Sequence, residues 1–276
     1  MSFIKNVFTL TFFCIVLVSC NKEKKEDKIS AVKDLVKRIL PGKSSFIEFE
    51  LATPSTGEKE KFEIFPDKET IKIKGSSISA LTAGFNYYLK YYCKIHISRA
   101  GENRKNLEKL PSLNHHITKE SPFKYRYYLN YCTYNYSMAF WQWEDWEREL
   151  DWMALNGINL PLAIIGTEKV WQNTLQKFNF SDEEIKSFIP GPAFTAWWLM
   201  DNLEGWGGPV SQQWIDSRVE LQQKIVKRMR ELGMQPIFQG FYGMVPNKLK
   251  DKFPGSRILS DTGNWCGGFQ RPAFLD

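Results

Sequence analysis

The stretch YRYYLNYCTYNYSMAFWQWEDWERELDWMALNGINLPL, Tyr125 to Leu162, decides which fold is expected. Its first part, up to Cys132, combines Tyr, Leu and Cys without a helical period, which is typical of a strand buried on both faces. The period then changes, because Trp146, Leu150 and Met153 fall at i, i+4 and i+7, the apolar stripe of an amphipathic helix. The stretch therefore predicts a strand followed by a helix.

The predicted helix ends at Asn156-Gly157, and a second apolar run of strand length, Ile158 to Ile165, follows it. A strand, a helix and a strand with short connections form a βαβ unit, whose two strands run parallel. Polar and aromatic residues, Asn130 to Asn135, come where the first strand ends. Because active sites of α/β barrels lie at this edge, we expect the functional site here.

The rest of the chain continues this pattern. A helix is predicted over Thr167 to Phe178, with Val170, Leu175 and Phe178 facing inward. A second helix begins at Ser181 with the capping box S-D-E-E, and a third covers Ser211 to Leu232. Gln235 to Phe241 is predicted to be a third strand. The Trp-rich segment Gly191 to Pro209 has no clean period and is expected to be a functional loop. About three βα repeats are present where a closed (β/α)₈ barrel needs eight, so residues 121–276 predict the first part of a TIM-type barrel, incomplete in this chain.

A small α+β domain is expected before the barrel, over residues 29–120. The sequence predicts a helix, three strands of an antiparallel sheet and a second helix, at Ile29 to Leu40, Phe46 to Leu51, Lys61 to Phe65, Thr70 to Lys74 and Ser77 to Tyr92. Alternating apolar and charged residues mark the strands as half-buried. The overall class is therefore α/β, with a small N-terminal α+β domain.

The composition is that of a globular protein, with 43% hydrophobic and 25% charged residues and a formal net charge of +6. The basic residues are dispersed among acids without a basic stripe, which argues against nucleic acid as a partner. The three cysteines outside the leader, Cys93, Cys132 and Cys266, have no metal-ligand spacing. We expect free and mostly buried thiols, no metal site and no cofactor.

The first twenty residues predict a targeting segment. Lys5 precedes the apolar run Val7 to Val18, which is too short to span a bilayer. The run ends in Leu-Val-Ser-Cys, which resembles a bacterial lipobox with Cys20 as the lipid-modified residue; the alternative is an ordinary secretory signal. The charged residues 21–28 would form a tether. A lipid-anchored protein of the bacterial cell envelope, held in the outer membrane and facing the periplasm or the cell surface, is expected.

Four strings carry a family resemblance: YRYYLNYCT, WEDWERELDWMALNGINLPL, GPAFTAWWLMDNL and LGMQPIFQGFYGMVP. Together they resemble glycoside hydrolase family 89, the α-N-acetylglucosaminidases, over roughly Ile29 to Asp276. The resemblance implies an exo-acting glycosidase that removes terminal α-linked N-acetylglucosamine from glycans with retention of configuration.

The resemblance also implies a substrate-binding set. Asn130 and Cys132 at the first strand end, Trp197 and Met200 in the Trp-rich segment, and Trp265 match pocket-lining positions for N-acetylglucosamine. Asn130 can donate and accept hydrogen bonds, and a Trp face suits the C–H groups of a pyranose ring. For any single Trp, core packing is the competing interpretation.

The catalytic pair is not assigned within the chain. Both family glutamates are expected beyond Asp276, so the 276 residues alone are expected to be inactive. Asp201 and Glu204 are the best-placed acids of the Trp-rich segment, whereas the acids of the helix after Trp143 are expected to face solvent: Glu144, Asp145, Glu147, Glu149 and Asp151. Two alternatives remain, a non-catalytic surface lipoprotein that binds amino sugars and a barrel enzyme of another glycan specificity.

Overall fold

The computed structural model describes residues 29–53, 59–66, 70–104, 107–260 and 262–276. The predicted leader, lipobox and tether lie outside the described residues. The chain divides into two compact units. Unit 1 combines the residues up to Arg126 with 149–159 and 228–235, and unit 2 combines 127–148, 160–227 and 236–276. The domain boundary predicted at residue 120 stays a prediction, because these units interleave along the chain.

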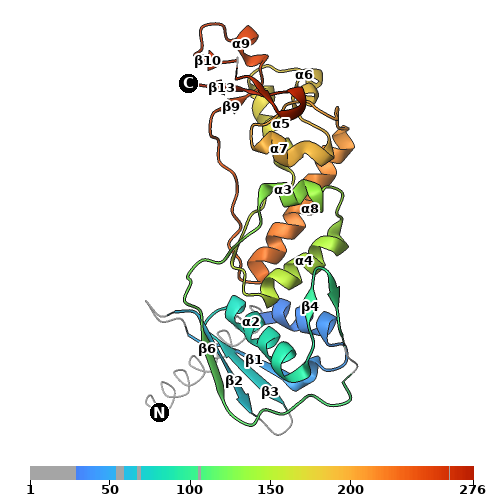
Figure 1. Cartoon of the computed structure of the whole chain (residues 1–276), viewed down its shortest axis with the longest axis vertical. Helices are drawn as coiled ribbons and strands as arrows, with labels where there is room; N and C mark the ends of the chain where they lie inside the picture. Colours follow the sequence, from blue (N-terminus) through green and yellow to red (C-terminus); the bar gives the residue numbers. More distant parts are fainter. Residues whose placement is uncertain (1–28, 54–58, 67–69, 105–106, 261) are drawn as a thin grey trace, which may run out of the picture. The chain divides into compact units, whose positions relative to one another are not determined.

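Unit 1 contains a four-stranded sheet of order β1-β3-β2-β6 (Figure 1). The strands are β1 (Ile47–Leu51), β2 (Lys61–Pro66), β3 (Ile71–Gly75) and β6 (Ile117–Glu120). β2 runs antiparallel to β3 and β6, but β1 runs parallel to β3, so the prediction of an antiparallel sheet is wrong for β1. β6 was not predicted because its sequence ITKE buries only its first residue and shows no alternation.

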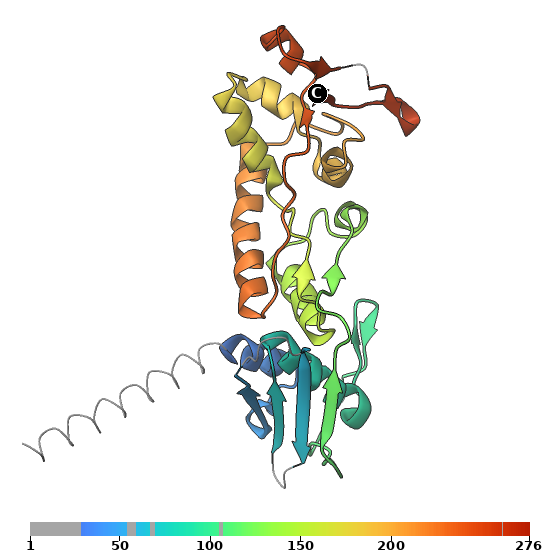
Figure 2. The same ribbon diagram turned by 90° about the vertical axis from the view of Figure 1, so that its left-hand side faces the viewer.

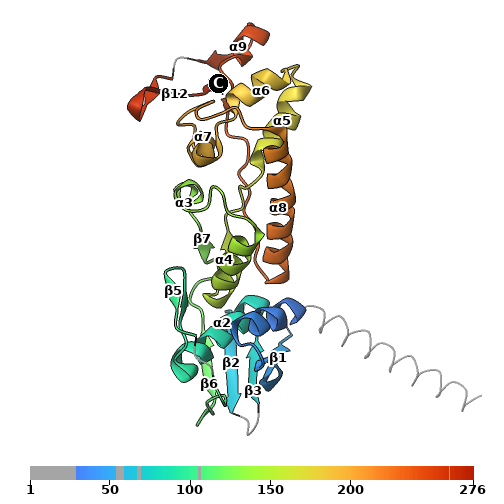
Figure 3. The same cartoon turned by 90° about the vertical axis from the view of Figure 1, so that its right-hand side faces the viewer.

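Two helices cover one face of this sheet. Residues 29–39 form the first helix, and α2 (Ile78–Tyr88) forms the second, continued by the π-turn η2 (Leu89–Cys93). In Figure 2 the sheet lies in front of these helices and in Figure 3 behind them. The apolar faces meet in a core of Val32, Leu35, Ile64, Ile73, Leu81 and Phe85, each fully buried. The open face carries charges, with Glu50 accepting from Lys72 at 2.6 Å and Lys74 at 3.2 Å. Short elements complete the unit: η1 (Ser44–Phe46), β4 (Ile97–Ser98) and β5 (Gly101–Glu102).

The helix α4 (Trp143–Leu155) has the predicted apolar stripe, and its three core residues are buried. The expectation that all its acids face solvent is wrong for Glu149 and Asp151, each 4% exposed. Arg38 donates two bonds of 2.7 Å to Asp151, and Arg99 lies 3.1 Å from Glu149. These carboxylates tie the last turns of α4 to the N-terminal elements of unit 1, so they are structural.

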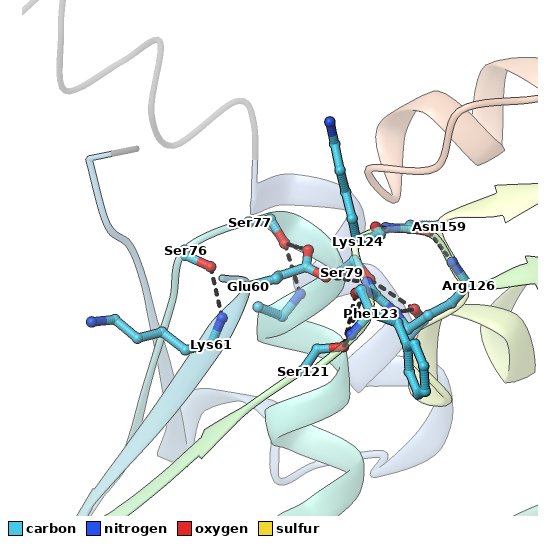
Figure 4. A network of polar contacts seen from close by, with 12 residues as sticks. Glu60, Lys61, Ser76, Ser77, Ser79, Ser121, Phe123, Lys124, Arg126 and Asn159 are labelled. Carbon is cyan, nitrogen blue, oxygen red and sulfur yellow. Dashed lines mark hydrogen bonds and ion pairs between the residues drawn. The ribbon is translucent and has the colours of Figure 1, made fainter. Parts of the chain in front are cut away.

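A polar network ties α2 and β2 to the segment that leads into β7 (Tyr127–Tyr128); we call it the Arg126 junction (Figure 4). The Arg126 guanidinium donates to the Glu60 carboxylate and to the carbonyl of Gly157, and also to the carbonyl of Phe123 at 2.9 Å. Glu60 accepts a second bond from Ser77, whose hydroxyl caps α2 by accepting from Ala80 N–H at 2.9 Å. Both charged groups are largely desolvated, with 16% and 20% of the Arg126 and Glu60 side chains exposed.

Unit 2 contains three short segments that run parallel to one another, and together they form the start of an α/β barrel. β7 pairs in parallel with β8 (Leu160–Pro161), and Leu162 forms a parallel bridge to Ile237. The long strands predicted at Tyr125 to Cys132, Ile158 to Ile165 and Gln235 to Phe241 are therefore much shorter. The first one ends early because α3 (Tyr131–Tyr136) begins there.

Helices and loops make up most of unit 2. The longer helices are α5 (Thr167–Lys177), α6 (Asp182–Phe188) and α8 (Gln212–Glu231), which match the predicted ones, and Ser181 caps α6 in the predicted capping box. The Trp-rich segment was predicted without regular structure, but it forms η3 (Pro192–Phe194) and α7 (Thr195–Leu199). The remaining elements are β9 (Met244–Val245), α9 (Leu249–Lys252), β10 (Ile258–Leu259), β11 (Asn264–Trp265), η4 (Cys266–Gly268), β12 (Phe269–Gln270) and β13 (Ala273–Leu275).

One face of α5 differs from its prediction. Val170 and Phe178 were expected to point inward, but they are 64% and 49% exposed. Together with Trp171 and Phe241 they line an apolar groove of about 550 Å³. Only Leu175 of the predicted stripe is buried, because the groove and not a packed core faces this side of the helix.

Candidate functional site

Asn130 caps α3, and this position decides what its side chain can do. Its Oδ1 accepts from the N–H of Thr133 at 3.0 Å and from the Thr133 hydroxyl at 2.9 Å. The residue is exposed, and among the described residues no group accepts a bond from its amide nitrogen. The N-cap preference of Asn explains why a helix starts here, directly after the strand. Cys132, which was predicted at a strand end, instead lies half-buried in the first turn of α3.

The segment that carries Trp197 and Met200 includes α7, which lies near α3 (Figure 3), and the side chain of Asn135 links the two. The amide of Asn135 donates to the carbonyl of Pro192 at 2.6 Å, and its oxygen accepts from the N–H of Ala196. These bonds join the beginning of η3 and the beginning of α7 to α3. Asn135 was predicted only as one of several polar residues near the site, and its role as a bridge appears in the structure alone.

The C-terminal end of α7 has a second support. Gln239 donates to the carbonyl of Leu199 at 2.7 Å, and the Tyr242 hydroxyl donates to the same carbonyl at 2.9 Å. Both donors follow the third parallel segment of unit 2, directly after Ile237. The α7 segment is therefore held from the first and the third of these segments, which are the elements expected to carry a barrel active site.

Aromatic rings connect Trp197 to Trp265. The two indole rings lie 6.5 Å apart between centroids, and the ring of Tyr136 meets Trp197 edge-on at 5.0 Å. Phe269 continues the series at 5.8 Å from Trp265. Both Trp side chains are half-buried, so part of each ring is accessible. We call Tyr136, Trp197, Trp265 and Phe269 the ring cluster; such faces can stack on the C–H groups of a sugar ring.

The structure brings some predicted contacts together and leaves others apart. Asn130 caps α3, and the ring of Tyr136 on the same helix contacts the ring of Trp197. The strand-end residues and the Trp-rich segment are therefore neighbours. Trp265, from a distant part of the chain, joins the same cluster. The assignment of Cys132 and Met200 to a sugar pocket stays a prediction. Core packing, the competing interpretation for any Trp, holds for Trp146, which is 1% exposed.

The acids of the Trp-rich segment serve other purposes in the structure. The Arg271 guanidinium donates to the carboxylate of Asp201 at 3.4 Å. Glu204 accepts from the N–H of Asn247 at 3.3 Å, and burial raises its pKa while this bond opposes the rise. Both groups link the segment to the chain's C-terminal part. Neither is assigned as a catalytic group.

Two buried charged residues, Glu168 and Arg218, lie where α5 and α8 meet α3 and α7. The sequence did not predict them, because no local pattern distinguishes them from surface charges. Glu168, in the first turn of α5, is 5% exposed, and its Oε2 accepts no hydrogen bond from a described residue. Burial raises the pKa of Glu168, whereas the N–H groups of Gly166 and of Glu168 itself and the charge of Arg218 oppose the rise.

Arg218 on α8 is also 5% exposed. Its guanidinium donates to the carbonyl of Trp141 at 2.9 Å and to the side-chain oxygen of Gln142 at 3.1 Å, and it lies 4.4 Å from the ring centroid of Trp214. We call Glu168 and Arg218 the Glu168 cluster. Its carboxylate and guanidinium influence each other electrostatically without forming an ion pair within 4 Å.

Three cysteines of the described residues are free. Cys93 is buried and Cys132 half-buried, but Cys266 is exposed, which corrects the expectation that the thiols are mostly buried.

Family models match most of the described chain. The α-N-acetylglucosaminidase N-terminal domain matches residues 30–112, and the TIM-barrel domain of the same family matches residues 126–276. The chain belongs to the α-N-acetylglucosaminidase family, glycoside hydrolase family 89. This agrees with the resemblance carried by the four strings of the sequence, and with the α/β fold and incomplete barrel described above.

Individual relatives agree with the family models. Human α-N-acetylglucosaminidase is 39% identical over 195 residues, which are 71% of this chain and 26% of the human protein. The family 89 glycoside hydrolase of Clostridium perfringens superposes with a TM-score of 0.87 and 40% identity, over 92% of this chain and 29% of the other. Structures of that enzyme contain 2-acetamido-1,2-dideoxynojirimycin, PUGNAc or its substrate GlcNAc-α-1,4-galactose. The chain thus spans less than a third of the length of these relatives.

Within the part of the chain that the structure describes, no helix combines the length and apolar character needed to cross a bilayer.

Proposed function

We propose that the natural-length protein is an exo-acting α-N-acetylglucosaminidase that removes terminal α-linked N-acetylglucosamine from glycans with retention of configuration. Family membership supports this, together with the substrate named for the Clostridium perfringens relative. The observation that carries the proposal for this chain is the ring cluster, in which Trp197 and Trp265 from distant segments meet. The family gives the reaction class, and the cluster gives a surface that fits a pyranose.

This chain's own residues would bind and orient the sugar. A half-buried indole excludes water from one face of the ring, and the Asn130 amide can donate to a ring hydroxyl or the acetamido carbonyl while its oxygen keeps the α3 cap. Retention requires a nucleophilic carboxylate and an acid/base carboxyl about 5–5.5 Å apart. Neither role is given to a described residue, so the proposed contribution of these 276 residues is binding.

Trp197→Ala tests the ring cluster. The natural-length protein should hydrolyse an aryl α-N-acetylglucosaminide. Trp197→Ala should lower kcat/KM by a factor that corresponds to about 1–3 kcal/mol of transition-state stabilisation, the size of a lost substrate contact. Tyr125→Ala is the matched control, since it removes a ring that is 58% exposed in unit 1. A folded Trp197→Ala protein with wild-type kcat/KM would remove the ring cluster from the sugar site.

Asn130→Ser is the sharper test of the second contact. Serine also caps helices, so α3 stays capped while the amide N–H₂ is lost. We expect weaker turnover with an unchanged melting temperature, whereas Asn173→Ser, at an exposed position of α5, should change neither. Equal kcat/KM in wild type and Asn130→Ser would show that this amide does not touch the substrate.

The same assay decides against the non-catalytic alternative. Binding of N-acetylglucosamine by a protein that releases no aryl product would identify an amino-sugar-binding lipoprotein. Hydrolysis of a different aryl glycoside at a higher kcat/KM would identify another glycan specificity. The α-configured product as the first one seen by NMR would support retention.

We also propose lipid anchoring at Cys20, which places the protein in the outer membrane with its body in the periplasm or at the cell surface. The support is the sequence Leu-Val-Ser-Cys after a short apolar run. Cys20→Ser should block processing or release the protein from the membrane fraction, with Cys14→Ser as the control within the leader. Unchanged membrane partition and maturation of Cys20→Ser would rule out the anchor.

A further inference from the structure

The Glu168 carboxyl interacts with the backbone N–H groups of Gly166 and of Glu168 itself, but one of its two oxygens has no partner. Its Oε2 is buried, and no described residue donates a hydrogen bond to it. Buried polar atoms without a partner are uncommon in folded proteins, and each one requires an explanation such as an internal water or a functional role. The exposure of 5% excludes bulk solvent as the partner.

A cavity of about 30 Å³ lies next to this carboxyl. Its lining comes from four elements that meet here: Asn135 of α3, Glu168 of α5, Thr195 of α7, and Trp214 and Arg218 of α8. A water molecule needs roughly 10–15 Å³ of such space and two to four polar partners. The cavity therefore has the size for one water and a few polar side chains among otherwise apolar lining residues, and it is too small for a sugar.

The charges at the cavity select its occupant. A metal cation would face the Arg218 guanidinium, and an anion would face the Glu168 carboxylate. Water suits both groups, because it donates to Oε2 of Glu168 and accepts an N–H or O–H from the opposite wall. A neutral molecule with donor and acceptor capacity is the occupant that leaves no lining group unsatisfied.

We propose that this cavity binds one ordered water molecule and that Glu168, acting through it, is a positioning residue for the sugar contacts on α3 and α7. The elements are already joined by Asn135, which bonds Pro192 and Ala196 from α3. The water would extend this single link into a network that also includes α5 and α8. The positioning role rests on the proposed function, whereas the water site does not.

The geometry explains why a displacement here would reach the substrate. Asn135 and Ala196 are hydrogen-bonded to each other, and each is directly followed in the sequence by a ring of the cluster, Tyr136 and Trp197. Trp197 and Tyr136 both belong to the ring cluster, and their ring centroids lie 5.0 Å apart. A shift of α7 against α3 would therefore separate the two surfaces that carry the predicted contacts.

The experiment uses the natural-length protein and two substitutions at one position. Glu168→Gln keeps a hydrogen-bonding group of the same shape, whereas Glu168→Met keeps the volume and loses the hydrogen bonds. Glu183→Met, at an exposed position of α6, is the control. The readouts are the electron density of the cavity, the inhibition constant of 2-acetamido-1,2-dideoxynojirimycin, and kcat and KM measured separately.

We expect density for one water within hydrogen-bond distance of Glu168 in the wild type and in Glu168→Gln. Glu168→Met should lose it and bind the inhibitor about tenfold more weakly or worse, the scale of a site displaced by a fraction of an ångström. KM should rise more than kcat falls, because binding contacts and not proton transfer are affected. Glu168→Gln should bind the inhibitor about as tightly as the wild type does.

A dry cavity in the wild-type density would overturn the water site. An unchanged inhibition constant in a folded Glu168→Met protein would overturn the positioning role. If Glu168→Met does not fold, Thr195→Val, which removes a hydroxyl from the same cavity wall, takes its place with the same two outcomes. A wild-type protein that neither binds the inhibitor nor cleaves the substrate would refute the proposed function and the positioning role together, while the density would still decide the water site.

Discussion

Two glutamate–arginine neighbourhoods of this molecule solve the problem of buried charge in different ways. At the Arg126 junction, Glu60 and the guanidinium meet directly, and the other donors find carbonyl and hydroxyl oxygens nearby. At the Glu168 cluster, the guanidinium is satisfied by Trp141 and Gln142, and the carboxylate is left with an unpartnered oxygen. The difference indicates that the first arrangement is structural, whereas the second keeps a polar group available.

The energetic expectations follow from this difference. A satisfied pair is costly to break, because the surviving partner is left buried and charged. A buried carboxylate with one unsatisfied oxygen bears a desolvation cost in the folded state, so removing its charge releases that cost. Neutralising the two glutamates should therefore have effects that differ in sign, whereas removing either arginine should destabilise the protein.

Arg218→Met should have the largest effect. It removes the hydrogen bonds to Trp141 and Gln142, the contact with the Trp214 ring and the positive charge that acts on the buried Glu168. We expect the free energy of unfolding of the natural-length protein to fall by about 3 kcal/mol in urea denaturation. Arg230→Met, exposed on the same helix α8, is the control and should change it by less than about 0.5 kcal/mol. Equal effects of the two substitutions would mean that the Arg218 contacts contribute little.

Arg126→Met should come next, with a loss of about 2 kcal/mol, since Glu60 keeps its bond from Ser77 and part of its solvent exposure. Arg148→Met removes a guanidinium that is 75% exposed and paired with Asp145, so it controls for the loss of a surface charge. Hydrogen exchange of the α2 amides should speed up in Arg126→Met. Unchanged exchange there would show that the junction does not hold α2.

The same substitution, Glu to Gln, should act in opposite directions at the two places. Glu60→Gln should destabilise by about 1 kcal/mol, because the ion pair with Arg126 becomes a hydrogen bond between a charged and a neutral group. Glu168→Gln should be neutral or stabilising at neutral pH. Thermal unfolding of both variants in one buffer measures the contrast, and destabilisation of equal size would contradict the distinction drawn between the two neighbourhoods.

The pH dependence sharpens this contrast. Because burial raises the pKa of Glu168 above its ordinary value of 4.5, the native state holds this proton more tightly than the unfolded chain does. Its contribution to stability is fully present below pH 4.5 and is lost as the pH rises through the folded-state pKa. The stability of the wild type relative to Glu168→Gln should therefore fall from pH 4 to pH 7, and a flat difference would contradict the raised pKa.

Ser77→Ala should destabilise by about 1 kcal/mol, less than either arginine substitution, through loss of the α2 cap and of one bond to Glu60. Ser187→Ala, at an exposed position near the end of α6, is the control. If Ser77→Ala and Arg126→Met are combined, their effects should be less than additive because both act on Glu60. Strict additivity would show that the junction is not a single network.

Local sequence patterns predicted the longer helices and the first three strands of unit 1 well, and the barrel strands poorly. The period of Trp146, Leu150 and Met153 located α4, and S-D-E-E located the start of α6, since both signals depend on neighbours within a few residues. The barrel strands were overestimated because aromatic runs look alike whether they pair or not. Asn130 carried the missing signal, since an N-cap residue at that point begins α3 and ends the strand.

The candidate site divides in the same way. The identities of Trp197 and Trp265 were available from the family resemblance, but only the fold shows that their rings meet. Glu168 could not be predicted, because its burial depends on α3, α7 and α8 closing around it from elsewhere in the chain. Likewise, the buried acids of α4 looked solvated because the arginines that pair with them lie about fifty to over a hundred residues away.

The three free thiols differ in how fast they should react with an alkylating reagent. Burial raises the pKa of Cys93 to about 11, so almost none of it is thiolate at neutral pH, whereas Cys266 is exposed directly after Trp265. Cys132 lies two residues after Asn130 and is half-buried. Alkylation should therefore proceed at Cys266 first, then at Cys132, with Cys93 unmodified. Because the two reactive thiols neighbour predicted sugar contacts, protection from alkylation offers a footprint of site occupancy that requires no turnover.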